Sequence, residues 1–227
     1  MAAKVLVADD HPLFREALRL ALARALPDAT VVEADSVAAL LAAAEQHTDA
    51  DLLLLDLHMP GAQGFSALVQ VRAHHPSLPV VIVSASEDPQ TMRRAVGHGA
   101  AGFVPKSTPV ETMVQALAAV LDGDVWVPEG VDLDGPALER AEAETAARLA
   151  ALTPQQFRVL TMLSAGLLNK QIAWELGVSE ATVKAHMTAI MHKLGANNRT
   201  QAVVLAQRLA LDRAVLASAP QEEAPPA

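Results

Sequence analysis

Acidic residues stand at the ends of two strongly apolar stretches of the chain. Asp9 and Asp10 follow the run Lys4–Ala8, and Asp56 closes a run of four leucines. Carboxylates that are brought together repel one another unless a cation compensates their charge. Mg²⁺ suits a site with few carboxylates, because this ion keeps several waters and accepts phosphate oxygens. The three acidic residues therefore predict a Mg²⁺ site.

Two further polar residues follow later apolar runs. Ser84 offers a short hydroxyl donor, and Lys106 carries a mobile positive charge that can neutralise another oxygen. A carboxylate can accept a phosphoryl group, and this chemistry needs mainly positioning and charge neutralisation. We therefore expect Asp56 to be the nucleophile. One acidic residue at a strand end is usually a solvated loop residue, but a set of this kind at one sheet edge indicates a site.

Alternating patterns in the first 122 residues indicate the elements that would position these side chains. The apolar runs are Lys4–Ala8, Thr30–Ala34, Asp51–Leu55, Pro79–Val83 and Ala101–Val104. The helical patterns between and after them are Leu13–Leu26, Val37–His47, Phe65–His74, Pro89–His98 and Pro109–Leu121. This order predicts an α/β domain with a five-stranded, doubly wound parallel sheet and helices on both faces. The carboxyl ends of such strands share one edge, where ligands bind.

Composition restricts the class of protein. The 227 residues include 52% hydrophobic residues, 3% aromatic residues and no cysteine, which indicates a folded protein without disulfides or thiol chemistry. No apolar stretch approaches the roughly 20 residues that span a bilayer. We therefore expect a cytoplasmic protein that does not bind membranes.

The net charge of −9 is unevenly distributed along the chain. Residues 123–150 contain two Lys or Arg and seven Asp or Glu, whereas residues 151–212 contain six and three. A basic segment in an acidic chain is a candidate for contact with nucleic acid. We predict a first domain at 1–122, an acidic linker at 123–150, a second domain at 151–212 and a disordered tail at 213–227. The second half of the linker, from residue 137, favours a helix with a solvated face.

Four helices are expected in the second domain. Thr153-Pro154 begins the first with a capping residue followed by proline. The next two helices, at 170–176 and 180–194, are joined by Gly177-Val178-Ser179, which is the pattern of a helix-turn-helix. A fourth helix follows at 198–211. The domain is therefore predicted to be an all-α, four-helix, helix-turn-helix domain.

The third of these helices has a face that suits the major groove of DNA. Its apolar spacing leaves a set of short or basic side chains outward, namely Thr182, Lys184, Ala185 and Thr188. Lys170, Lys193 and Arg199 would hold the DNA backbone. The alternative is a helical bundle that binds protein instead of DNA, since helix-turn-helix shapes also occur in such proteins.

Four motifs occur in order in the first domain: VLVADDHPLFR from Val5, DLHMPG from Asp56, VSA from Val83 and GFVPK from Gly102. With them, about the first 120 residues resemble the receiver domain of bacterial two-component response regulators, which has a flavodoxin-like fold. Phe103 stands where such receivers often have Tyr, so a hydrogen bond from that hydroxyl is missing here.

The resemblance implies a role for each residue of the site. Asp56 is implied to be the phosphoacceptor. The implied Mg²⁺ ligands are Asp9, Asp10, Asp56 and the backbone carbonyl of His58. The resemblance implies that Ser84 and Phe103 form a switch pair and that Lys106 binds phosphoryl oxygens. If the Ser84 hydroxyl turns to bond a phosphoryl oxygen, it vacates space into which the Phe103 ring can move. Ala85 contributes by being small, which leaves a phosphodonor room to approach.

The second domain carries the motifs LTP from Leu152, NKQIA from Asn169, LGVS from Leu176 and TVKAH from Thr182. They resemble the LuxR/FixJ-type DNA-binding domain. The resemblance implies that Lys184, Ala185 and Thr188 read bases and that the fourth helix forms a dimer surface. The whole set expected to contact DNA is Asn169, Lys170, Thr182, Lys184, Ala185, Thr188, Lys193 and Arg199.

Together, the two resemblances imply a NarL/FixJ-type response regulator. A partner sensor histidine kinase would phosphorylate Asp56, and the chain would then bind promoter DNA as a homodimer to control transcription. Its only catalysis would be its own Mg²⁺-dependent phosphoryl transfer and slow dephosphorylation. A phosphorylation-independent regulator and an aspartyl-phosphate phosphatase are the alternatives. The phosphatase class is disfavoured because its nucleophile lies in an Asp-x-Asp arrangement on the first strand, whereas Asp9 and Asp10 are adjacent.

Overall fold

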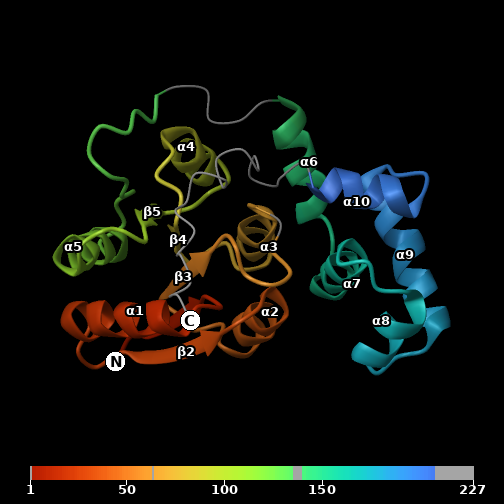
Figure 1. Ribbon diagram of the computed structural model, residues 1–227, viewed down its shortest axis with the longest axis horizontal. Helices are drawn as coiled ribbons and strands as arrows, with labels where there is room; N and C mark the ends of the chain where they lie inside the picture. Colours follow the sequence, from red (N-terminus) through yellow and green to blue (C-terminus); the bar gives the residue numbers. More distant parts are fainter. Residues whose placement is uncertain (1, 63, 135–139, 208–227) are drawn as a thin grey trace, which may run out of the picture.

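The computed structural model describes residues 2–62, 64–134 and 140–207 (Figure 1). The first part alternates strands and helices: β1 (Lys4–Ala8), α1 (Pro12–Ala25), β2 (Thr30–Ala34), α2 (Val37–Gln46), β3 (Leu52–Asp56), α3 (Ser66–His74), β4 (Val80–Ser84), α4 (Pro89–Gly97), β5 (Gly102–Pro105) and α5 (Val110–Leu121). Helices follow: α6 (Arg140–Ala150), α7 (Pro154–Ser164), α8 (Asn169–Glu175), α9 (Glu180–Leu194) and α10 (Arg199–Gln207).

The strands form one parallel sheet in the order β2-β1-β3-β4-β5. The order of strands reverses between β1 and β3, which is the position where sheets of this type bind ligands. The predicted five-stranded, doubly wound sheet is therefore confirmed. Asp56 and Ser84 are the last residues of β3 and β4, so both strands begin and end one residue later than the sequence pattern indicated.

Successive leucines of β3 enter two separate hydrophobic cores. Leu52 and Leu54 belong to a core under α1 and α5, whereas Leu53 and Leu55 belong to a core under α2, α3 and α4. All four side chains are at most 1% exposed. Strand side chains alternate between the two faces of a sheet, and both faces of this sheet are covered (Figure 1). This coverage explains why the leucine run has no polar interruption.

The second part of the chain has the predicted helical organisation. The Thr153 hydroxyl accepts a hydrogen bond from the Gln156 amide at 3.3 Å, and the Gln156 side chain accepts one from the Thr153 amide at 3.1 Å. These reciprocal bonds confirm the predicted cap of α7. Helices α8 and α9 are joined by a tight turn in which Gly177 has a φ of +62°. Ser179 then caps α9 by accepting from the Thr182 amide at 3.1 Å.

Helix α6 is not the solvated linker helix that the sequence suggested. Thr145 and Leu149 are 4% and 0% exposed, because one face of α6 packs on α3 and on the helices that follow it. The Gln70 side chain also donates a hydrogen bond to the Leu149 carbonyl. Residues at helical spacing on this face are therefore buried, and the core under α3 continues through α6 into α7 to α10.

One acidic residue of α6, Glu142, is bound by the first domain. Glu142 Oε1 lies 2.9 Å from Arg94 Nε and 2.8 Å from His98 Nε2 on and after α4. Burial lowers the pKa of His98 below its usual value, although Glu142 acts in the opposite direction. The neutral ring must carry its proton on Nε2, because the carboxylate only accepts. Glu142 is thus directed toward α4.

Some predicted segments fall outside the described residues. They are 135–139 of the linker, 208–211 of the fourth helix and the tail at 213–227. None of the described helices combines the length and the apolar character that crossing a membrane requires.

Glu142→Ala is expected to loosen α6 from α4, because it removes hydrogen bonds to one charged and one buried partner. The opening free energy of α6, measured by native-state hydrogen exchange, should fall by about 2 kcal/mol. Glu144→Ala is the matched control on the same helix, since Glu144 pairs with Arg140, whose side chain is 94% exposed. The control should change this free energy by less than about 0.5 kcal/mol. An equal opening free energy of α6 in both variants would contradict the conclusion that Glu142 holds α6 on α4.

Candidate functional site

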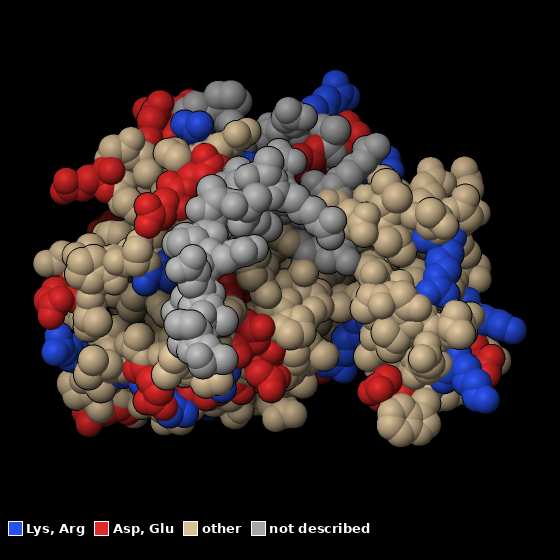
Figure 2. Space-filling view, in the orientation of Figure 1, with Lys and Arg blue, Asp and Glu red and all other residues tan. Residues whose placement is uncertain are grey.

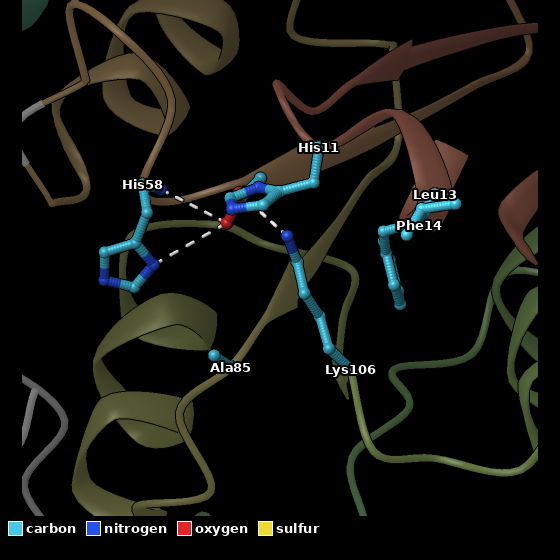
Figure 3. A pocket seen from close by; sticks show the side chains of 7 residues that line it. His11, Leu13, Phe14, His58, Ala85 and Lys106 are labelled. Carbon is cyan, nitrogen blue, oxygen red and sulfur yellow. Dashed lines mark hydrogen bonds and ion pairs between the residues drawn. The ribbon is translucent and has the colours of Figure 1, made fainter. Parts of the chain in front are cut away.

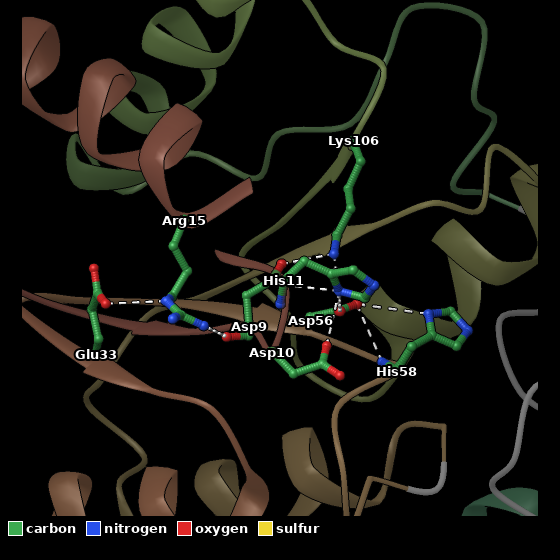
Figure 4. A network of polar contacts seen from close by, with 8 residues as sticks. All are labelled: Asp9, Asp10, His11, Arg15, Glu33, Asp56, His58 and Lys106. Carbon is green, nitrogen blue, oxygen red and sulfur yellow. Dashed lines mark hydrogen bonds and ion pairs between the residues drawn. The ribbon is translucent and has the colours of Figure 1, made fainter. Parts of the chain in front are cut away.

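The carboxyl edge of the sheet brings together the acidic residues predicted to form a site. Ligand atoms of Asp9, Asp10, His11 and Asp56 all lie within 4.8 Å of one another (Figure 4). Asp9 follows β1 and Asp56 ends β3, and these two strands are direct neighbours in the sheet. Both side chains are 1% exposed. The expected convergence of the carboxylates therefore occurs, and two of them are almost completely removed from water.

Lys106 provides the positive charge that two buried carboxylates require. Its Nζ lies 2.7 Å from Asp9 Oδ2 and 3.0 Å from Asp56 Oδ2. The ammonium also lies 4.7 Å from the centroid of the Phe14 ring, a cation–π distance. The amide of Lys106 donates to the Ser84 carbonyl at 2.7 Å, which holds the start of this side chain beside the end of β4. The lysine thus reaches across the edge from β5 to β1 and β3.

The environment of Asp56 keeps it ionised. Burial acts to raise its pKa, but contacts with His58 and the positive charge of Lys106 act in the opposite direction, and the net pKa lies below the usual value. The His58 amide donates to Asp56 Oδ1 at 3.2 Å, and the His58 Nδ1 atom lies 3.6 Å from the same oxygen. An ionised carboxylate is the form that can attack a phosphorus atom.

Two carboxylate oxygens of the cluster lack hydrogen bonds. Asp9 Oδ2 and Asp10 Oδ1 are buried, and neither accepts a hydrogen bond from any residue that the structure describes. Asp9 Oδ2 instead lies 2.7 Å from Lys106 Nζ, and Asp10 Oδ1 lies 2.9 Å from His11 Nδ1. Buried oxygens with unused lone pairs, close to a third carboxylate, form a donor set that fits a hard divalent cation such as Mg²⁺.

An open cavity of about 510 Å³ gives access to Asp56 (Figure 3). Its lining consists of His11, Leu13, Phe14, Asp56, His58, Ala85 and Lys106. Ala85 is exposed and contributes only a methyl group, so the approach to Asp56 past the end of β4 is unobstructed. The cavity is large enough for a phosphoryl group on a small donor or on a protein side chain.

The two residues predicted to form a switch, Ser84 and Phe103, are not among the residues that line the cavity. Ser84 is completely buried, and its hydroxyl accepts a hydrogen bond from the Ser86 amide at 3.2 Å. Phe103 in β5 is also completely buried and belongs to the core under α2, α3 and α4. The hydroxyl would therefore have to turn, and the ring would have to shift within a packed core, for a switch of the expected kind.

Sequence reasoning missed several residues that contact the site. His11 contributes its amide to Asp9 Oδ1 at 2.7 Å, and its ring approaches all three carboxylates. Phe14 supports the lysine, and Arg15 donates to the Asp9 carbonyl at 2.8 Å. The position of His11 directly after the acidic pair was the available signal. The structure shows the amide and the ring of His58 close to Asp56, and the role of its carbonyl stays a prediction.

Helix α9 presents the face that was expected to contact DNA. Thr182, Lys184, Ala185 and Thr188 are all exposed, while Val183, Met187 and Ile190 between them are buried. The Thr182 hydroxyl lies 2.9 Å from that of Ser179, and the Thr188 hydroxyl donates to the Lys184 carbonyl at 3.1 Å. In the view of Figure 2, Lys and Arg side chains mark the outer edge of the helical domain, whereas most Asp and Glu side chains lie over the first domain.

The other four residues that were expected to contact DNA lie outside this face of α9, and their environments differ. Lys170 is exposed at the start of α8, next to the half-buried Asn169. Lys193 Nζ donates to the Ala151 carbonyl and to the Gln156 side chain, both at 2.8 Å. Arg199 donates to the Leu167 carbonyl at 2.6 Å. The last two cations therefore hold the helices of the domain together, in addition to any contact with DNA.

Two family comparisons agree with this architecture. Residues 5–118 match the response regulator receiver domain, and residues 150–206 match the luxR family of bacterial regulatory proteins. The chain belongs to the NarL/LuxR family of response regulators. The response regulator thus combines a receiver domain with a LuxR-type DNA-binding domain, and it is a DNA-binding transcriptional regulator.

Individual proteins resemble the regulator over nearly its whole length. The glycerol metabolism activator of Pseudomonas putida is 41% identical over 215 residues, which cover 89% of this chain and 94% of that protein. The nitrate/nitrite response regulator protein NarL of Escherichia coli K12 is 34% identical over 204 residues, with 89% and 94% covered. Among solved structures, RcsB from Salmonella enterica serovar Typhimurium, bound to a promoter with the phosphomimetic BeF3⁻, has a TM-score of 0.54 at 27% identity, covering 92% of this chain and 100% of that chain.

Lys170→Ala is expected to weaken DNA binding and its dependence on salt, because Lys170 is exposed at the start of α8 and is expected to contact the DNA backbone. Removing one cation that neutralises a phosphate should lower the slope of log affinity against log salt by about 0.9. The measurement is fluorescence anisotropy on duplex DNA selected by the regulator from a random pool, at several salt concentrations. Lys4→Ala is the control, because Lys4 lies in the receiver domain and pairs with Asp49. An unchanged slope in Lys170→Ala would contradict the predicted contact of α8 with the DNA backbone.

Proposed function

We propose that Asp56 accepts a phosphoryl group from a sensor histidine kinase and that this reaction controls binding of the regulator to promoter DNA. The observation that supports it is the grouping of the buried Asp56 with two further carboxylates and Lys106 beside an open cavity. The proposal includes no reaction on any other substrate. Kinase and promoter would both be reached in the cytoplasm, which we propose as the location of the protein.

Residues of the chain supply most of what the phosphoryl transfer needs. A carboxylate oxygen of Asp56 would attack the phosphorus of a phosphohistidine, so that one P–O bond forms as the P–N bond breaks. Asp9, Asp10, Asp56 and the His58 carbonyl would hold Mg²⁺, which when bound neutralises charge on phosphoryl oxygens. Lys106 would move from the carboxylates to a phosphoryl oxygen. The Ser84 hydroxyl would turn and donate a hydrogen bond to another phosphoryl oxygen. The Phe103 ring would then move into the space that the hydroxyl vacates.

Two contacts connect the phosphorylation site to the DNA-binding domain in this proposal. The loop after Asp56 reaches α7, where a Cβ atom on Gly61 would lie 2.9 Å from the Thr161 methyl group. Helix α4, which follows Ser84, holds α6 through the contacts to Glu142. A movement at the ends of β3 or β4 would therefore alter the packing of α6 and α7.

On DNA, α9 would lie in the major groove. Lys184, Ala185 and Thr188 would face base edges there, and Thr182 and Lys170 would lie near phosphates with Asn169, Lys193 and Arg199. The regulator would bind as a homodimer, with α10 as the dimer surface. Two-fold symmetry then predicts two half-sites separated by about one helical turn of DNA.

Asp56→Asn is expected to abolish phosphorylation. Wild-type protein incubated with Mg²⁺ and a small phosphodonor should gain about 80 Da per chain in an adduct that hydroxylamine removes. Asp28→Asn is the control, since Asp28 is exposed and precedes β2, at the edge of the sheet opposite the cluster. Equal labelling of Asp56→Asn and wild type by mass spectrometry would exclude Asp56. DNA affinity that is the same with and without the adduct would instead support a phosphorylation-independent regulator.

A further inference from the structure

An arginine outside the predicted site holds the backbone of the acidic pair. Arg15 lies in the first turns of α1, and its Nη1 atom donates to the Asp9 carbonyl at 2.8 Å (Figure 4). Its Nε atom donates to Glu33 Oε2 on β2 at 3.0 Å. The Arg15 and Glu33 side chains are only 19% and 25% exposed. The guanidinium therefore links the start of α1, the end of β1 and the edge strand β2.

The acceptor of this hydrogen bond has a special position in the chain. The Asp9 carbonyl belongs to the peptide group that joins Asp9 to Asp10, so its direction determines how the two carboxylates are oriented relative to each other. On the other side of Asp9, its amide donates to the Ala34 carbonyl at 3.0 Å. The His11 amide, one residue after the pair, donates to Asp9 Oδ1 at 2.7 Å. Asp9 is thus held through its amide, its carbonyl and one oxygen of its side chain.

We propose that Arg15 is a positioning residue for the Mg²⁺ ion of the receiver, and that Glu33 holds Arg15 in place. The inference depends on the Mg²⁺ site in the proposed function. Mg²⁺ requires near-ideal octahedral geometry, whereas Ca²⁺ accepts irregular and flexible oxygen ligands. A carbonyl that is free to turn would let the Asp9 and Asp10 carboxylates diverge, which Mg²⁺ tolerates less well than Ca²⁺ does.

Charge alone predicts the opposite effect of removing Arg15. A positive guanidinium close to a divalent cation disfavours that cation, so losing the charge should strengthen metal binding if electrostatics were its only role. Glu33 offsets the charge of Arg15, which it contacts through Oε2. Its other oxygen, Oε1, lies 2.6 Å from Arg19 Nε. The sign of the change in Mg²⁺ affinity therefore distinguishes a positioning residue from a surface ion pair.

The experiment measures Mg²⁺ and Ca²⁺ dissociation constants of the full chain by titration calorimetry without a phosphodonor. Arg15→Gln is expected to bind Mg²⁺ about tenfold more weakly, the lower limit for loss of an outer-shell partner. Its Ca²⁺ affinity should fall less, so the preference for Mg²⁺ over Ca²⁺ decreases. Arg15→Lys keeps the charge without the forked geometry and should also weaken Mg²⁺ binding.

Arg19→Gln is the matched control. The variant removes the same positive charge, and the arginine it removes also pairs with Glu33. Among the described residues, however, Arg19 makes no contact with the Asp9 carbonyl. It should leave the Mg²⁺ dissociation constant within about twofold of wild type. Thermal unfolding of each variant without metal separates lost affinity from lost folding. If Arg15→Gln does not fold, Glu33→Gln replaces it, and a smaller loss of Mg²⁺ affinity is expected.

The outcomes separate this inference from the proposed function. Wild-type protein that binds no Mg²⁺ would contradict the proposed metal site itself. Wild-type protein that binds Mg²⁺, with Arg15→Gln binding it equally or more tightly, would overturn only the role of Arg15. Parallel losses of Mg²⁺ and Ca²⁺ affinity would also overturn it, because they would indicate a general weakening and not a loss of geometry.

Discussion

The site depends on one ammonium group placed between two buried carboxylates. Asp9 and Asp56 are each 1% exposed, and Lys106 lies within 3.0 Å of an oxygen of both. Buried carboxylates without a compensating cation would be strongly unfavourable, or would take up protons and lose their nucleophilicity. The central strands make the burial possible, because leucines on both faces of β3 hold its end in a fixed place. The positive charge of Lys106 makes the burial of two carboxylates energetically possible.

The same arrangement explains how the site can be both rigid and responsive. The carboxylates belong to strand ends and to a backbone held by Arg15 and His11, so they have little freedom. Lys106, in contrast, is a flexible side chain whose ammonium also contacts the Phe14 ring, at 4.7 Å from its centroid, in addition to the two carboxylates. A new anionic group near Asp56 could therefore draw the ammonium away while the carboxylates keep their positions.

The sequence predicted the parts of the molecule that follow from local pattern. Asp9, Asp10, Asp56 and Lys106 all come directly after apolar strands, so the topology of a parallel sheet was enough to place them together. Arg15 and Glu33 were missed, because their contact depends on how α1 lies over β2, and neither residue stands at a strand end. The burial of α6 was missed for a similar reason, since its apolar face is made mainly of alanines and Leu149, a pattern that a solvated helix also shows.

The position of α6 bears on how the two domains can influence each other. The core under α3 continues through Leu149 into the DNA-binding domain, and Gly61 leaves no space for a side chain against Thr161. Close-packed interfaces of this kind do not deform gradually, so a displacement at the ends of β3 or β4 would either be absorbed within the receiver or separate the packed surfaces. Glu142 lies at such an interface, because its partners Arg94 and His98 are in and directly after α4, the helix that follows Ser84. The core under α1 and α5 contains no residue of α6 to α10 among the described residues, so this route runs through one face of the sheet.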